Sequence, residues 1–398
     1  MIEAQTNKKE TLLKNLEGIF QKCEERAAHY DANNLFFQED FDELKEAGYL
    51  LIAVPEEFGG YGMKLDECTA LTRKLAYHAA PTAVALNMHI YWTGLVADLW
   101  RGGDTSIQWL LEEAGKGKVF AAGHGESGND SPGIYSTCKA EKVDGGYKFT
   151  GHKMFGSLSP VWDYLGFHGQ DNSDPDNPMV IHAFMPRDTA NYEIKKTWDD
   201  VLGMRATRSD DTILNGVFVP DALIVRKLPT GFKGMDGFVL GIFCWALMGF
   251  ANVYYGLAQR VLDLVLEKLP KKKSISFDRP SMAYNGVIQH HVSEMIMEIE
   301  GIGPHLDTTA REWSEGKDYG GAWGVKIVAT KCRSVEGSWR VVDKAMDIMG
   351  GYGLLRKAGF ERLFRDARLG KIHPANGFLA REFLAKAMLG IDVDEQPR

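Results

Sequence analysis

The stretch from Gly237 to Ala258 contains no charged residue, and it constrains the fold of this chain more than any other segment. An apolar run of roughly 20 residues is long enough to span a bilayer. However, Asn252, Tyr254 and Tyr255 interrupt the stretch, three glycines lie within it, and no second such run follows. The stretch therefore predicts a helix that is buried on all sides, within a helical bundle or a subunit interface, and no insertion into a membrane.

The spacing of apolar residues divides the chain into three parts. It is helical from residue 10 to about 118, except at residues 54–62 (VPEEFGGYG), where proline and glycine indicate a loop. From there to about residue 225, short alternating segments between turn residues indicate an antiparallel barrel or sandwich. Helical spacing returns beyond Gly237. We expect an α+β multidomain chain with domains at residues 1–118, 119–228 and 229–398.

Charge and cysteine content limit the possible partners and the compartment. The 54 acidic residues outnumber the 46 basic ones, and the one basic run, Lys271 to Lys273, is typical of a solvated helix end or linker. Binding of nucleic acid is therefore not expected. The five cysteines are scattered without metal-ligand spacing, and residues 1–22 resemble neither a signal peptide nor a transit peptide. These features predict free thiols and a cytoplasmic protein.

Residues 123–128 (GHGESG) fit the G-x-G-x-x-G fingerprint of dinucleotide-binding folds. That motif must open a helix whose N-terminus faces the pyrophosphate. Here residues 129–133 (NDSPG) follow and lead into a strand-like run, so a Rossmann fold is not expected.

Six motifs, spread over nearly the whole chain and in the right order, resemble the acyl-CoA dehydrogenase superfamily. They are residues 54–62 (family V-P-E-x-x-G-G-x-G), 128–130 (family G-S-D), 151–163 (GHKMFGSLSPVWD; family G-x-K-x-W-I-T-N-G-x-x-A-D), 202–207 (family L-G-x-R-x-[ST]), 217–220 (family V-x-V-P), and 350–353 with 361–367 (family G-G-x-G-Y…R-x-x-R-D-A). The resemblance implies an N-terminal all-α domain, a central antiparallel β-barrel and a C-terminal four-helix bundle.

The resemblance also implies a flavin site between the barrel and the bundle, completed by a neighbouring subunit of a homotetramer, or of a homodimer. Phe155 takes the place of the family's tryptophan, and Ser157 that of a threonine near flavin N5; a strand-core phenylalanine and a turn serine are the alternatives. Arg279 is equally consistent with an ordinary exposed arginine, and Asp347 stands where the family has glutamine. The implied cofactor-binding residues are Ala122, Gly123, Gly128, Asn129, Phe155, Ser157, Arg279, Gln289, Asp347, Gly350, Gly351 and Asn376.

The family's usual catalytic base is missing from the sequence. Removing the α-proton of an acyl thioester needs a carboxylate, which most members carry where this chain has Pro374 and a subset carries near Ala246. Two enzymatic readings follow. The first, which we expect because it prevails in the superfamily, is FAD-dependent α,β-dehydrogenation of an acyl-CoA with hydride transfer to flavin N5 and an electron-acceptor flavoprotein as partner. Its base would be His373 or a relocated carboxylate, for instance Glu382.

The second reading is a monooxygenase that uses O₂ and reduced flavin, FAD or FMN, from a flavin reductase to hydroxylate nitrogen, sulfur or carbon. Such relatives need no α-proton base, and Ser157 and His373 would be the catalytic residues beside the flavin. A third reading is a redox-inactive relative that binds acyl-CoA or a partner protein.

The remaining histidines have competing readings. His373 also suits a turn. His89 falls where the family's N-terminal helices line the substrate cavity, and we expect it to contact substrate; a buried position on an apolar helix face is the alternative. His290 and His291 are adjacent, without a carboxylate or cysteine at ligand spacing, so no metal site is expected.

Overall fold

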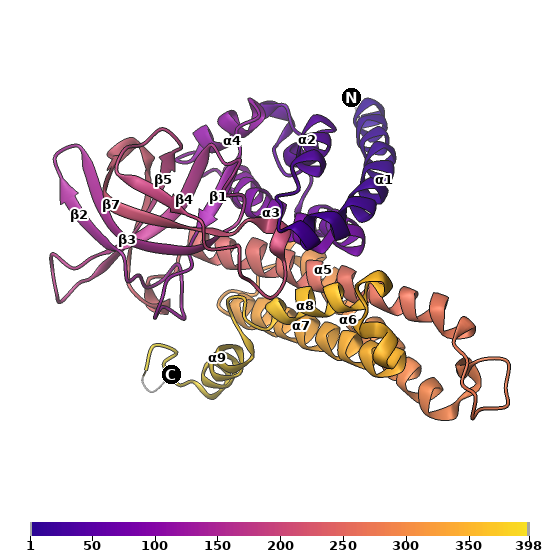
Figure 1. Ribbon diagram of the computed structural model, residues 1–398. Helices are drawn as coiled ribbons and strands as arrows, with labels where there is room; N and C mark the ends of the chain where they lie inside the picture. The colour runs from indigo at the N-terminus through magenta and orange to yellow at the C-terminus, as the bar shows by residue number, and fades with distance from the viewer. Residues whose placement is uncertain (1, 396–398) are drawn as a thin grey trace.

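The computed structural model describes residues 2–395, with side chains from residue 8 onward, and its elements follow the predicted helix, strand, helix order. In Figure 1 the strands lie at the left, the N-terminal helices above, and the C-terminal helices below and to the right. The N-terminal part consists of α1 (Ile2–Asn33), α2 (Gln38–Glu46), α3 (Leu65–Arg101) and α4 (Gln108–Gly115).

Helix α3 is two helices joined at a kink. Ala79 has φ −146° and ψ 81°, two residues before Pro81. Proline has no N–H to donate and its ring crowds the preceding turn, which breaks the helix there. The kink sets the direction of the second half of α3, which packs against the C-terminal domain and carries part of the cavity wall described below.

The uncharged stretch forms most of α5 (Gly237–Lys268), as predicted. Among the described residues, the segment Gly237–Lys271 is the one helical segment long and apolar enough to cross a membrane, and 78% of its apolar window is buried inside the protein. Three of its four glycines allow α3 to approach closely, because an added Cβ would lie 2.0–2.3 Å from atoms of α3. The pairs are Gly241 with Leu95, Gly249 with Asn87, and Gly256 with Arg73.

The central domain is one sheet with the strand order β6-β7-β3-β2-β4-β5-β8, to which β1 adds beside β4. Most pairs are antiparallel, as predicted, but β1 pairs in parallel with β4, and β2 meets β4 in parallel at Lys139 and Gln170. The hydrogen-bonded path ends at β6 and β8. The strands are β1 (Phe120–Gly123), β2 (Lys139–Val143), β3 (Gly146–Gly156), β4 (Tyr164–Asp171), β5 (Met179–Pro186), β6 (Tyr192–Lys195), β7 (Asp210–Pro220) and β8 (Ile224–Pro229).

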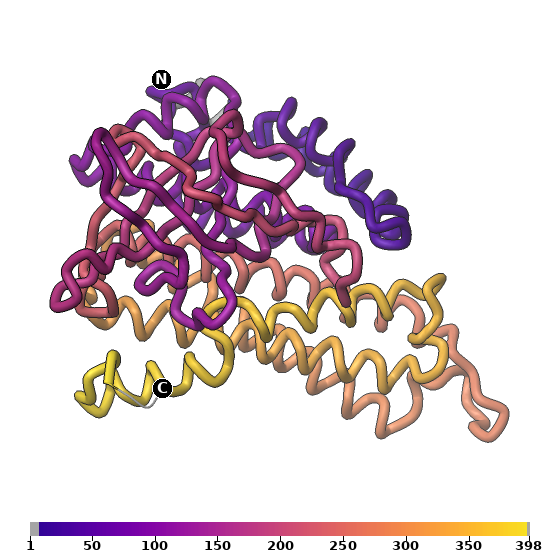
Figure 2. The backbone as a smooth tube through the Cα atoms, turned by 60° about the vertical axis from the view of Figure 1, so that its left-hand side comes forward, coloured from indigo at the N-terminus to yellow at the C-terminus, as the bar shows by residue number. Residues whose placement is uncertain are grey.

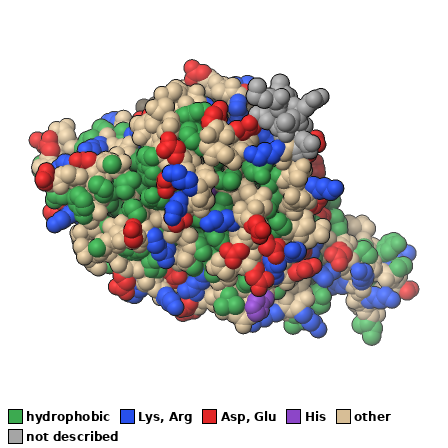
Figure 3. All heavy atoms as spheres, turned by 90° about the horizontal axis from the view of Figure 1, so that it is seen from above, with side chains coloured by type: hydrophobic (Ala, Val, Ile, Leu, Met, Phe, Trp, Pro, Cys, Tyr) green, Lys and Arg blue, Asp and Glu red, His purple; other side chains and the backbone are tan. Residues whose placement is uncertain are grey.

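The C-terminal domain packs α5 with α6 (Gly286–Ser314), α7 (Ala322–Met349) and α8 (Phe360–Gly370). Helix α9 (Gly377–Leu389) leaves this bundle and lies beneath the sheet domain, whereas the loop between α5 and α6 projects from the opposite end of the molecule (Figures 1 and 2). On the face seen from above, acidic and basic side chains are interspersed (Figure 3). The described residues of that face therefore form no continuous basic surface of the kind that binds nucleic acid.

Candidate active site

A cavity of about 260 Å³ lies where α3, the sheet domain, α5 and the segment after α8 meet. Most of its wall is apolar. The side chains with hydroxyl or imidazole groups that line it are Tyr91, His124, Ser157, Thr207, Ser209 and His373.

Three hydroxyls on the sheet side of the cavity form a chain whose direction is fixed. We call Ser157, Ser209 and Thr207 the hydroxyl wall. Thr207 must donate its proton to the carbonyl oxygen of Met204, 2.8 Å away, because a carbonyl only accepts. Ser209, 2.7 Å from Thr207, must then donate to Thr207, and Ser157 must donate to Ser209 at the same distance. Ser157 therefore presents only acceptor lone pairs to the cavity.

The hydroxyl wall is held by a buried carboxylate of the helical bundle. Asp366 Oδ1 accepts the backbone N–H of Met204 at 2.5 Å, and the Met204 carbonyl also accepts the indole N–H of Trp198. Burial raises the pKa of Asp366 to about 6. This residue is the aspartate of the R-x-x-R-D-A motif, so the motif positions a loop of the sheet domain.

His373 lines the opposite side of the cavity, packed against the ring of Phe250 at 4.4 Å between centroids. Burial and the nearby ammonium of Lys331 lower its pKa to about 3, so the imidazole is neutral near pH 7. Its Nδ1 has no hydrogen-bond partner within the described structure.

The backbone around His373 is held by the buried side chain of Lys331 on α7. The Lys331 Nζ donates to the carbonyl oxygens of His373 at 3.1 Å and Ala375 at 3.0 Å. Ala375 has φ +55°, a conformation that a non-glycine residue adopts only when its surroundings impose it. Burial lowers the pKa of Lys331 to about 8.

Both positions where the family carries its carboxylate base face this cavity. Pro374 and Ala246 line it, and none of its described lining residues is Asp or Glu. Glu382, considered as a relocated base, lies on α9 and pairs with Lys386 at 2.7 Å instead.

Phe155, which is exposed, and Trp198, which is buried, form an aromatic corner at the cavity. Phe155 is 55% exposed and has φ +60°, and its ring meets that of Trp198 edge-on at 6.0 Å. A large apolar side chain held exposed in a strained conformation indicates a binding surface. Together with the acceptor oxygen of Ser157, this corner fits the apolar face and polar edge of a flavin ring.

The loop after β1 supports this corner. Ala122 lines the cavity, and Gly125 cannot take a side chain because a Cβ there would lie 2.7 Å from the Met154 carbonyl. The Asn129 side chain, expected to contact the cofactor, donates within its own loop to Glu126 and to the Tyr135 carbonyl. Beneath the loop, Glu126 and Lys153 form a buried ion pair.

Of the other predicted cofactor residues, Gly123 ends β1 and Gly128 lies in the loop after it, whereas the remaining ones lie elsewhere. Lys272 Nζ donates to the Ile348 and Met349 carbonyls, which joins the α5–α6 loop to the end of α7, far from the cavity (Figure 1). The exposed residues of this far end, as we call it, are Arg279, Gln289, Asp347, Gly350 and Gly351. One chain therefore does not bring them together with Phe155 and Ser157. Asn376 caps α9, where its side-chain oxygen accepts two backbone N–H groups.

The expected substrate contact of His89 is replaced by a structural role. His89 is fully buried, Nε2 lies 2.9 Å from the Leu50 carbonyl, and Nδ1 accepts the Phe120 N–H at 3.1 Å. It lies outside the cavity wall. The face of α3 that does line the cavity carries Val84, Met88 and Tyr91, at spacings of four and three residues.

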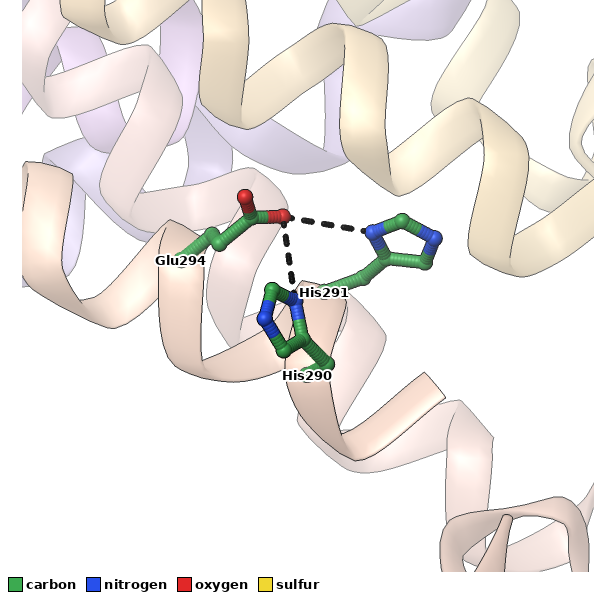
Figure 4. A group of neighbouring side chains, drawn as sticks. All are labelled: His290, His291 and Glu294. Carbon is green, nitrogen blue, oxygen red and sulfur yellow. Dashed lines mark hydrogen bonds and ion pairs between the residues drawn. The ribbon is translucent and has the colours of Figure 1, made fainter. Parts of the chain in front are cut away.

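A carboxylate does stand at ligand spacing from the paired histidines, contrary to the sequence analysis. Glu294 on the next turn of α6 lies 3.7 Å from His290 Nδ1 and 3.3 Å from His291 Nδ1 (Figure 4). These three groups could hold a metal ion by distance alone. However, the ammonium of Lys344 lies 2.6 Å from the same Glu294 oxygen. The cluster is thus already neutralised by a protein cation, and we assign no metal to it.

Five residues of the site were not predicted from the sequence: Tyr91, His124, Thr207, Ser209 and Lys331. His124 could have been predicted, because it stands between two glycines in the loop that aligns with the family's flavin-contacting loop. For the others, no local pattern distinguishes them from core residues.

Comparisons with known proteins agree with this geometry. The profile described as "Acyl-CoA dehydrogenase, N-terminal domain" matches residues 6–105, and the profile described as "Acyl-CoA dehydrogenase, C-terminal domain" matches residues 242–389. The chain belongs to the acyl-CoA dehydrogenase superfamily. It is a flavoprotein oxidoreductase of that group, and the predicted fold is confirmed.

Relatives in this superfamily point to more than one chemistry. YdbM of Bacillus subtilis (strain 168), named provisionally as an acyl-CoA dehydrogenase, is 26% identical over 382 residues, which cover 93% of this chain and 94% of YdbM. The structure of KijD3 with FMN and an amino-keto sugar nucleotide has a TM-score of 0.84 at 21% identity and covers 97% and 95% of the two chains. Methanesulfinate monooxygenase MsuC of Pseudomonas fluorescens has a TM-score of 0.79 at 16% identity and covers 97% and 98%. At these identities the two structures establish the shared fold alone.

Proposed function

We propose that this protein is a reduced-flavin-dependent monooxygenase that hydroxylates nitrogen, sulfur or carbon in a small molecule. The observation that carries the proposal is the cavity wall: both family positions for the α-proton base face it, at Pro374 and Ala246, and none of the described residues that line it is a carboxylate. When bound, reduced flavin supplies two electrons and two protons, so that one atom of O₂ enters the substrate and the other leaves as water.

The direction of the hydroxyl wall supports this choice over dehydrogenation. The family resemblance puts flavin N5 near Ser157. Oxidised flavin has an acceptor at N5 and reduced flavin a donor N–H. Ser157 donates its own proton to Ser209, so its oxygen can only accept a hydrogen bond, which suits the N–H of the reduced form. A dehydrogenase must instead bind oxidised flavin ready to receive a hydride.

His373 supplies the second polar function. A neutral imidazole can donate one hydrogen bond to an oxygen atom in the cavity and accept another without adding a charge to an apolar site. Phe250 restricts its ring, and Lys331 holds its backbone. His373 therefore binds and orients an oxygen while the surrounding apolar wall excludes water.

The arrangement of the predicted flavin residues bears on the cofactor. KijD3 was crystallised with FMN, which lacks an adenosine and so would not need the far end of a second copy. FAD would in addition need the far end of a second copy, in a homotetramer or homodimer. On this proposal the protein's partner is a flavin reductase in the cytoplasm, and the substrate is not an acyl-CoA.

An anaerobic titration of the flavin-loaded protein with acyl-CoA thioesters of several chain lengths tests the proposal. We expect the oxidised-flavin absorbance to persist, and we expect the protein to bind flavin reduced by dithionite more tightly than oxidised flavin. Pro374→Glu, with Pro374→Gln as its control, restores a carboxylate at the family position; because the substrate is not an acyl-CoA, the absorbance should persist in this variant too, and bleaching in Pro374→Glu alone would show that the cavity accepts a thioester. Bleaching of the parent protein by any thioester would establish dehydrogenation instead, and failure to bind either flavin form would favour a redox-inactive protein.

A further inference from the structure

Two polar groups at the α3 side of the cavity have no partner in the protein. Tyr91 and His124 form what we call the deep end, with ring centroids 6.4 Å apart. The Tyr91 hydroxyl and His124 Nε2 are both buried without a hydrogen-bond partner, and they are not bonded to each other. Buried polar atoms are nearly always paired, so an unpaired one that faces a cavity, as these two do, calls for a partner from outside the chain.

The proton on His124 is directed by the imidazole behind it. His124 Nδ1 and His168 Nδ1 are 3.0 Å apart, so one donates to the other. The backbone N–H of Gly133, a fixed donor, points at His168 Nε2 from 3.2 Å, which makes that nitrogen an acceptor. The Tyr135 carbonyl also lies 3.0 Å from this nitrogen, but it keeps the Asn129 amide as a donor when Nε2 carries no proton. A proton on Nε2 would instead leave the buried Gly133 N–H without an acceptor among the described residues. His168 therefore carries its proton on Nδ1 and donates it to His124.

The consequence is a donor facing the cavity. With Nδ1 as acceptor, a neutral His124 must carry its proton on Nε2. The groups around it keep it neutral: burial, together with His182 and the Lys153 ammonium, lowers its pKa to about 3 against the opposing effect of Glu126. The deep end thus presents an imidazole N–H and a phenol O–H on an otherwise apolar wall.

We infer that the deep end is a substrate subsite for a neutral hydrogen-bond acceptor, a carbonyl oxygen or its equivalent on an apolar ring compound. One such oxygen has two lone pairs and can receive both donors. A charged acceptor is disfavoured because no cationic side chain lines the cavity. The inference deepens the proposed monooxygenase function, on which it rests, by naming the class of molecule that the site orients.

Calorimetric titration of the protein, saturated with oxidised flavin so that no turnover occurs, tests the subsite. The probes share one bicyclic frame: 1-indanone carries a carbonyl, indane carries no polar group, and indole carries a donor N–H. We expect 1-indanone to bind roughly three- to tenfold more tightly than indane, the net gain of about one hydrogen bond, and indole to show no such gain.

Variants then locate the effect. His124→Phe and Tyr91→Phe each keep the ring and remove one donor, so each should reduce the 1-indanone preference by about threefold or more while the affinity for indane stays the same. Tyr30→Phe is the matched control, because the Tyr30 hydroxyl is also buried without a partner but belongs to α1, outside the cavity wall.

Equal binding of 1-indanone and indane to the parent protein would overturn the inference without any variant. A preference that survives both substitutions would overturn it too, since the carbonyl would then be held elsewhere. If the protein with reduced flavin and O₂ oxygenates no substrate while it still prefers 1-indanone over indane, the result contradicts the proposed function but not the subsite.

Discussion

The two sides of the cavity are each held by one buried charge from the helical bundle, and the charges have opposite sign. Asp366 on α8 binds the Met204 N–H and thereby fixes the hydroxyl wall, in which every proton has an acceptor within the protein. Lys331 on α7 binds two carbonyls around His373 but leaves the His373 ring nitrogen Nδ1 without a partner. The hydroxyl wall is therefore fully hydrogen-bonded before any ligand binds, whereas the His373 ring is held in place with its Nδ1 still available to a ligand.

Removing the negative anchor should have the largest effect. Asp366→Ala leaves the buried Met204 N–H without an acceptor, which lowers the free energy of unfolding by about 3 kcal/mol. It also leaves the Met204 backbone, whose carbonyl directs the hydroxyl wall, no longer fixed in place. We expect flavin affinity, measured by fluorescence titration, to fall roughly 100-fold. Asp366→Asn keeps the acceptor oxygen and should stay within about threefold of the parent. Equal affinities for the Ala variant and the parent would show that the wall does not depend on Asp366.

Removing the positive anchor should change turnover rather than flavin binding. In Lys331→Met the His373 segment loses both of its side-chain donors, and we expect kcat to fall roughly 30-fold, as for a catalytic group displaced by less than 1 Å. Stability at pH 7 should change by less than about 1 kcal/mol, because the desolvation that lowers the Lys331 pKa offsets its hydrogen bonds. Lys326→Met, on the same helix but paired with Glu312 away from the cavity wall, is the control. A parallel loss of flavin affinity would contradict the division between the two sides.

The two charges predict opposite dependence of stability on pH. The Asp366 pKa is raised to about 6 from 3.8, so the folded chain holds the extra proton between these values and stability falls as pH rises through them. The Lys331 pKa is lowered to about 8 from 10.5, so the unfolded chain holds the extra proton and stability rises with pH over that range. Across each pH range the stability changes by at most about 3 kcal/mol.

Urea unfolding at a series of pH values, comparing the parent with Asp366→Asn and Lys331→Met, measures these slopes. Asp366→Asn should lose only the fall in stability between the two Asp366 pKa values, and Lys331→Met only the rise between the two Lys331 pKa values. A slope that persists in the variant belongs to some other group.

The smallest expected effect concerns the direction of the hydroxyl wall. Ser209→Ala frees the Ser157 proton to donate into the cavity, so the preference for reduced over oxidised flavin should shrink by about fivefold, roughly 1 kcal/mol. Dissociation constants for both flavin forms give this ratio. Ser209→Thr keeps the hydroxyl and should keep the preference for reduced flavin. If Ser209→Ala keeps this preference as well, Ser157 is not the group that distinguishes reduced from oxidised flavin.

Local patterns in the sequence sufficed for the order of the domains and for the buried character of α5. The family resemblance implied that Pro374 and Ala246 stand where a base would be, and both line the cavity. Parallel pairing of β1 with β4 was not predictable from alternation alone, because alternation describes a strand and not its neighbour.

The polar side of the site depends on contacts that no local pattern reveals. Lys331 meets the His373 carbonyl 42 residues away, and Ser157 meets Ser209 across 52. The choice between His89 and Tyr91 on α3 depends on how the kink at Ala79 turns the second half of the helix, which sequence spacing does not define. The orphaned atoms of His124 and Tyr91 become visible only once every other partner has been placed.

The separation of the cavity from the far end has a consequence for mass action. A mononucleotide flavin confined to the cavity would bind one chain with an affinity independent of protein concentration. A dinucleotide that also reached Arg279 or Gly350 of another copy would bridge two chains, so its apparent affinity would rise with protein concentration and its release would accompany dissociation of the subunits. The cofactor that the protein retains on dilution would thus report how many chains share it.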